Sequence, residues 1–256
     1  MSIHRLVIGN WKMNPDTLLE ARRLARQTRT AAAKLKLSEV VICPPFPFLM
    51  VASGRQSGPN FAFGAQSVSI AEGGAHTGEV SAAMLRSLGA SFVIVGHSEE
   101  RARGITDETV SQAALRASAA GLTAVVCVGE KTRTESGEHF AFLKNQIEHS
   151  LAGLDAGALK HIILAYEPIW AIGAKEAMAP EAVGETALFI KKVLADHFGP
   201  LESAKVKILY GGSVNFRNAA DIMRLGRVDG LLVGRESVNW PGFSALLKAV
   251  DEVVIA

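Results

Sequence analysis

Cysteine is scarce in this chain, which has only Cys43 and Cys127 among its 256 residues. Each lies inside an apolar run, where a reduced thiol behaves as a small buried hydrophobic group. No CxxC spacing occurs, so the sequence gives no sign of a disulfide framework or a cysteine metal site. Reduced cysteines favour a cytoplasmic protein.

An excess of charge and long apolar runs are also missing. The 27 basic and 25 acidic residues leave a net charge of +2, and no run of Lys or Arg is long enough to form a basic stripe. This argues against electrostatic binding to nucleic acid or to a membrane surface. No segment approaches the roughly 18 apolar residues of a membrane span, and we expect no export signal at the N-terminus.

Linkers rich in Gly and Ser, charge blocks and low-complexity segments are absent too, which predicts one domain over residues 1–256. The chain instead alternates short apolar runs with longer amphipathic segments. The runs begin at Leu6, Val40, Phe61, Phe92, Thr123, Ile162, Lys207 and Gly230. The segments typical of helices cover residues 16–35, 46–56, 81–88, 106–120, 138–151, 180–198, 218–225 and 243–253. Eight strand–helix units predict an α/β fold, the single-domain (β/α)8 TIM barrel.

The most informative stretch is IILAYEPIWAIG, residues 162–173, in which an apolar run ends at Glu167 and Pro168 stops the strand. A carboxylate at the mouth of an apolar core is poorly solvated and suited to accept a proton from carbon. Gly173 then indicates a loop able to close over a ligand. The structural alternative is a capped strand end with a solvated Glu167.

Other strand ends deliver polar groups to the same rim, because a barrel places its site at the carboxyl ends of its strands. Lys12 follows the first strand and is a candidate anchor for an anion, although most lysines are solvated surface groups. His97 follows the fourth strand and precedes a short polar turn. Amides of that turn would donate to one ring nitrogen, keeping the imidazole neutral and its other nitrogen able to donate. The alternative for His97 is a structural histidine.

Glycines mark the last two strand ends, in Tyr210-Gly211-Gly212-Ser213 and Leu232-Val233-Gly234. Backbone amides after strands seven and eight commonly bind phosphate in barrel enzymes. A single glycine pair would be weak evidence, since turns need glycine everywhere. Together the two pairs predict a phosphorylated small substrate.

Seven motifs carry a resemblance to a known family. They are NWKMN (10–14), GAQ (64–66), TGE (77–79), GHSE (96–99), CVGE (127–130), YEPIWAIG (166–173) and YGGSV (210–214). In this order, and over nearly the full length, they resemble the triosephosphate isomerase family. The resemblance implies interconversion of dihydroxyacetone phosphate and D-glyceraldehyde 3-phosphate through an enediolate.

The resemblance also implies residue roles. Glu167 would be the base and His97 the neutral electrophile, with Lys12 and Asn10 stabilising the enediolate and its phosphate. Phosphate would be held by Gly173, Ser213 and Gly234, beneath a lid of residues 168–178 that Tyr210 and Ser213 latch. Ser98 and Glu99 would support the site, Glu99 by pairing with Lys12. The chemistry needs no metal and no organic cofactor. A homodimer is implied, with Thr77 reaching towards residues 10–13 of the partner.

Three departures from the family pattern stand out. Arg235 replaces a second glycine after strand eight, where its backbone can still donate to phosphate while its side chain adds a cation or crowds the site. The lid tip carries Ala174, Lys175 and Glu176, with a glycine hinge lost and the charges shifted. Glu100 replaces an arginine that helps to tie the subunits together, so the interface charges must be rewired, with Arg101 or Arg103 as candidates.

Alternative functions keep the barrel and change either the substrate or the chemistry. One is an isomerase for a four-carbon ketose phosphate, to which the lid tip and Arg235 would be tuned. Another is a non-catalytic barrel that binds a metabolite, which the intact set Asn10, Lys12, His97 and Glu167 disfavours. An aldolase needs a Schiff-base lysine at a strand end. Lys160, Lys205 and Lys207 lie at strand beginnings instead.

Overall fold

The computed structural model describes residues 5–52, 60–134, 136–172 and 177–253, and eight strands form within them. They are β1 (Arg5–Asn10), β2 (Ser38–Cys43), β3 (Phe61–Ala65), β4 (Phe92–Val95), β5 (Thr123–Val128), β6 (Ile162–Tyr166), β7 (Lys207–Tyr210) and β8 (Gly230–Val233). The last six begin at the predicted residues, and β1 and β2 begin slightly earlier. Continuous apolar runs therefore located every predicted strand.

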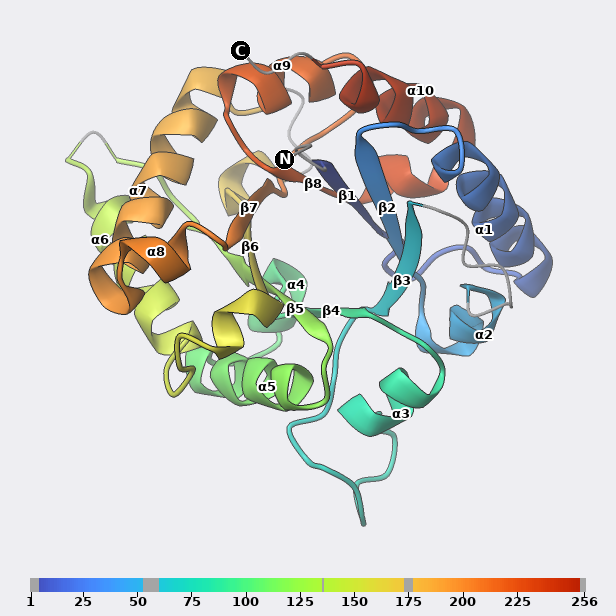
Figure 1. Ribbon diagram of the computed structural model, residues 1–256, viewed down its shortest axis with the longest axis horizontal. Helices are drawn as coiled ribbons and strands as arrows, with labels where there is room; N and C mark the ends of the chain where they lie inside the picture. The colour runs from blue at the N-terminus through green and yellow to red at the C-terminus, as the bar shows by residue number, and fades with distance from the viewer. Residues whose placement is uncertain (1–4, 53–59, 135, 173–176, 254–256) are drawn as a thin grey trace.

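The strands form a closed barrel in sequence order, and every neighbouring pair is parallel. β1 closes the ring by pairing with β8, with Leu6 opposite Gly230 and Gly9 opposite Val233. Figure 1 shows the strands as an inner ring and the helices as an outer one. The predicted (β/α)8 barrel is confirmed.

Both faces of the strands are buried, which explains why their sequences are continuously apolar. Leu6 and Ile8 belong to the smaller core cluster inside the barrel, whereas Val7 between them belongs to the larger cluster under the helices. This alternation follows from the two-residue period of a strand. Two packed layers hold the strand ends rigidly in place.

The outer layer has a helix in each predicted segment, although residues 53–56 of the segment 46–56 lie outside the described residues. It contains α1 (Leu18–Ala32), α2 (Leu49–Ala52), α3 (Ala82–Ser87), α5 (Asp107–Ala119), α6 (Glu138–Ser150), α7 (Pro180–Phe198), α9 (Ala219–Leu225) and α10 (Trp240–Asp251). Short elements complete it: α4 (Ser98–Arg101), α8 (Pro200–Ser203), η1 (Phe46–Phe48), η2 (Ala158–His161), η3 (Ile169–Ala171) and η4 (Arg235–Val238). Within the described ranges, no helix is both long and apolar enough to cross a membrane.

Helix starts follow local capping chemistry. Thr17 and Thr106 accept hydrogen bonds from backbone amides of the first turns of α1 and α5. The prediction for α10 was wrong at its start, because the helix begins at Trp240 and not at Phe243. Pro241 is tolerated there, since the first turn of a helix does not use its backbone donors.

Candidate active site

A cavity of about 570 Å³ opens at the carboxyl ends of the strands. It brings together eight of the predicted site residues: Asn10, Lys12, His97, Glu99, Glu167, Ser213, Gly234 and Arg235. Gly173 and the lid-tip residues 174–176 lie outside the described residues. Side chains far apart in the chain thus share one site.

Glu167 follows β6 directly, and its side chain is almost wholly buried, with 3% of the residue exposed. One carboxylate oxygen, Oε1, lies 3.1 Å from His97 Nε2. The other, Oε2, accepts a hydrogen bond from the backbone N–H of Ser98 at 3.0 Å. A buried carboxylate and an imidazole from two separate strands therefore meet directly.

The second ring nitrogen of His97 is held by its own turn. The Glu99 N–H donates to Nδ1 at 3.2 Å, as the sequence predicted, so the ring proton of the neutral imidazole is on Nε2. Burial alone would lower the pKa of His97, but the hydrogen bond and charge of Glu167 together raise it above its ordinary value. The sequence prediction of a neutral ring did not include this contact.

Lys12 adopts a left-handed backbone, with φ of 53°, in the loop that follows β1. Three contacts hold it there. The side-chain oxygen of Asn10 accepts from the Lys12 N–H at 3.0 Å, and Gln66 Nε2 donates to the Lys12 carbonyl at 2.8 Å. Lys12 Nζ lies 2.5 Å from Glu99 Oε1, the pairing that the family resemblance implied. The support from Gln66 was missed, although its GAQ motif signalled it.

The glycines after β7 and β8 let neighbouring parts of the site approach closely. A Cβ on Gly211 would lie 2.9 Å from Glu167 Cγ, so the glycine lets the two strand ends approach closely. Arg235 lies at the start of η4 without a positive φ, and its side chain is exposed and has no ion pair among the described residues. Arg235 lines the cavity, which keeps a volume of about 570 Å³.

Tyr210, predicted as a lid latch, is fully buried at the end of β7. Burial raises the pKa of its hydroxyl to about 12, while a hydrogen bond with the backbone of Met178, the last residue of the predicted lid, acts to lower it. Sequence reasoning gave no role to Glu130, which accepts hydrogen bonds from the Tyr166 hydroxyl and the Trp170 indole, each at 2.8 Å. The position of Glu130 just after β5 was the available signal.

Two predictions concern the subunit interface. Thr77 is exposed on the long loop between β3 and α3, outside the cavity. Arg101 was one of two candidates, with Arg103, for rewiring the interface charges. Its guanidinium is engaged within the chain, by the Gly96 and Cys127 carbonyls at 2.7 and 3.1 Å and by the Asp107 carboxylate.

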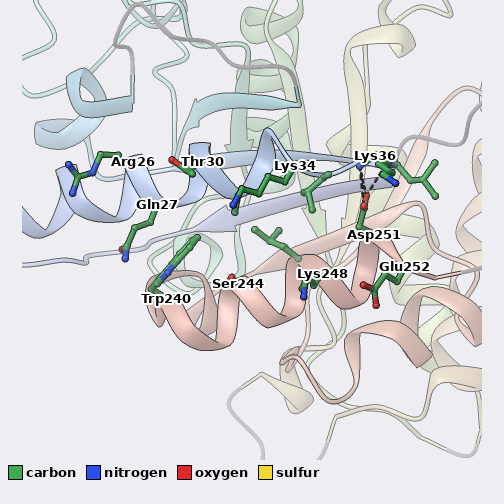
Figure 2. Close-up of a pocket in the computed structure, with 14 residues that line it drawn as sticks. Arg26, Gln27, Thr30, Lys34, Lys36, Trp240, Ser244, Lys248, Asp251 and Glu252 are labelled. Carbon is green, nitrogen blue, oxygen red and sulfur yellow. Dashed lines mark hydrogen bonds between the residues drawn. The ribbon is translucent and has the colours of Figure 1, made fainter.

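The size of a cavity does not identify the active site of this protein. A larger cavity, of about 760 Å³, lies between α1 and α10 and contains none of the predicted site residues (Figure 2). The catalytic chemistry therefore has to be located by residue type and geometry. In the described part of the chain, no group of three or more His, Cys, Asp or Glu side chains is placed to hold a metal ion.

Comparison with known proteins agrees with this geometry. Residues 5–250 match the model of the family described as triosephosphate isomerase. The chain belongs to the triosephosphate isomerase family. Triosephosphate isomerase of Endomicrobium trichonymphae is 40% identical over 246 residues, which cover 95% of this chain and 97% of that protein. The Thermus thermophilus enzyme of the same name is 41% identical over 245 residues, covering 95% and 97%.

A solved structure gives the same result. The chain resembles the crystal structure of triosephosphate isomerase from Bartonella henselae with a TM-score of 0.84 and 34% identity, covering 96% of this chain and 98% of that one. None of these names favours the four-carbon alternative.

Proposed function

We propose that this chain, folded as one domain, is a triosephosphate isomerase that interconverts dihydroxyacetone phosphate and D-glyceraldehyde 3-phosphate. The observation that carries the proposal is the contact of 3.1 Å between a buried carboxylate, Glu167, and His97 Nε2 in an open cavity at the strand ends. Moving a proton between adjacent carbons needs a base and a group that stabilises charge on oxygen. These two side chains supply both.

Glu167 is the base in this proposal. Without a substrate, its carboxylate is held by the Ser98 N–H and by His97. A bound substrate would take over the His97 donor, and the carboxylate would then accept a proton from the carbon beside the carbonyl. A positioned general base contributes a factor of about 10²–10⁴ in rate.

His97 and Lys12 stabilise the negative charge that develops on oxygen. The Glu99 N–H keeps Nδ1 as an acceptor, so Nε2 presents a proton to the substrate carbonyl. As Glu167 turns to the substrate, its raising effect on the pKa of His97 is lost and the lowering effect of burial remains. A neutral imidazole then donates the hydrogen bond. Asn10 assists by fixing the backbone of Lys12.

The phosphate of the substrate binds in the same cavity, at the ends of β7 and β8. Backbone amides at Ser213 and Gly234 are its proposed donors, together with Gly173 of the lid. Lys12 and Arg235 line the same cavity and supply positive charge. Closure of the lid excludes water, because an exposed enediol phosphate would lose its phosphate. The two buried free thiols fit a cytoplasmic location.

A coupled assay with dihydroxyacetone phosphate tests the proposal, with and without the substitution Glu167→Asp. Shortening the side chain withdraws the carboxylate by about 1 Å, for which we expect a loss of about 10²-fold in kcat. Affinity for a phosphorylated hydroxamate, a mimic of the enediolate, should change far less. An unchanged kcat in Glu167→Asp would show that another group is the base.

A further inference from the structure

The backbone of Glu167 rests on the segment that follows β5. The Glu167 N–H donates to the Val128 carbonyl at 2.8 Å. Beside this contact, a Cβ on Gly129 would lie 1.7 Å from the Glu167 carbonyl oxygen, so no side chain fits there. The peptide of the proposed base and the peptide of Gly129 are therefore in direct contact.

The same segment holds the residues on both sides of Glu167. The Glu130 carbonyl accepts from the Ile169 N–H at 3.0 Å, and its carboxylate accepts from Tyr166 and Trp170. A shift of residues 128–130 would therefore also move the turn that contains Glu167. Whatever fixes Gly129 consequently fixes the base.

Gly129 is fixed from outside the barrel by helix α6. The Gly129 N–H donates to Gln146 Oε1 at 2.8 Å, and Gln146 is buried, with 5% exposed. Gln146 lies on the buried face of α6 with Leu143 and Ile147, at the back of the strand ends. Losing the acceptor of a hydrogen bond to a nearly buried amide is costly, because the amide keeps its desolvation penalty.

We propose that Gln146 is a positioning residue for the reaction. Its side-chain oxygen fixes the position of the Gly129 peptide. That peptide in turn fixes the position of the Glu167 carboxylate relative to His97 and the substrate. The inference rests on the proposed function, and it assigns a task in the reaction to a residue that does not line the active-site cavity.

Three variants separate positioning from stability. Gln146→Met keeps the length of the side chain and removes the acceptor, so we expect kcat to fall about tenfold or more while KM stays within about twofold. Gln146→Glu keeps an oxygen acceptor and should recover most of that loss. Leu143→Ala, a buried position on the same helix, should lower the melting temperature at least as much as Gln146→Met while leaving kcat unchanged below the transition.

The hydrogen exchange rate of the Gly129 amide gives a readout that does not depend on activity. Gln146→Met should speed this exchange, measured by NMR, and Gln146→Glu should not. Wild-type kcat in Gln146→Met, or a kcat loss that Leu143→Ala reproduces, would overturn the inference. A wild-type protein without isomerase activity would defeat the proposed function alone, since the exchange comparison would still test whether Gln146 holds Gly129.

Discussion

At the scale of single residues, the pair His97 and Glu167 makes a prediction about charge. The hydrogen bond and charge of Glu167 raise the pKa of His97, while burial, the largest single influence, lowers it. Replacing Glu167 with Gln removes the charge and leaves the burial. The pKa of His97 should then fall below its value in the unaltered protein, so that the ring stays neutral to lower pH.

Titration of the imidazole by NMR measures this change in the two proteins. Glu99→Gln is a useful comparison, because Glu99 raises the pKa of His97 less than Glu167 does. The pKa of His97 should therefore fall less in Glu99→Gln than in Glu167→Gln. A pKa of His97 that stays the same or rises in Glu167→Gln would contradict the electrostatic account of the pair.

The role of a residue could be predicted from the sequence only where that residue follows a strand. Glu167, His97 and Lys12 each follow a buried strand, so the barrel rule places them on one rim. Gln146 and Arg101 lie on helices instead, and a polar residue on an amphipathic helix has the same pattern whether it faces water or a backbone amide. The contacts of Gln146 and Arg101 depend on how helices and strands pack together. The hydrophobic period of the sequence does not reveal this packing.

At the scale of elements, the end of α10 is tied to β1 by Arg5. This buried guanidinium donates to the carbonyls of Val250 and Asp251 at 2.7 and 2.9 Å, and also to that of Val253. Burial lowers the pKa of Arg5, and the charge of Asp251 opposes that effect. Three carbonyls at the end of the helix thus depend on one side chain.

Arg5→Met should loosen this junction. The variant leaves the three carbonyls without their donors, for which we expect a loss of about 2–4 kcal/mol in the free energy of unfolding. Unfolding in urea measures it. Arg22→Met, at an exposed position on α1, is the control and should stay within about 0.5 kcal/mol of the starting protein. Equal unfolding midpoints in the two variants would refute the role of Arg5.

Element boundaries were predictable to the extent that local signals set them. The predicted range of α7, residues 180–198, matches the structure, because Pro180 opens the helix and Gly199 follows it. The short helix α8 was not predicted, since four residues carry no readable period. For the same reason η4, on which Arg235 lies, could not be placed from the sequence.

At the scale of the whole molecule, one segment departs from the compact barrel. The loop between β3 and α3, which carries Thr77, projects away from the ring of helices (Figure 1). On this loop the apolar side chain of Ile70 is 40% exposed. Contact with another subunit would cover it.

We expect this surface to form the homodimer, with Thr77 inserted beside the partner's active-site loop. Thr77→Arg would force a long charged side chain into that contact, so the protein should become monomeric and kcat/KM should fall about tenfold or more. Light scattering after size exclusion, with the assay run at the same protein concentration, measures both effects. Thr30→Arg, at an exposed position on α1, should leave the mass and the rate unchanged. A Thr77→Arg protein that keeps the dimer mass and full activity would place the interface elsewhere and leave Thr77 without a role in assembly.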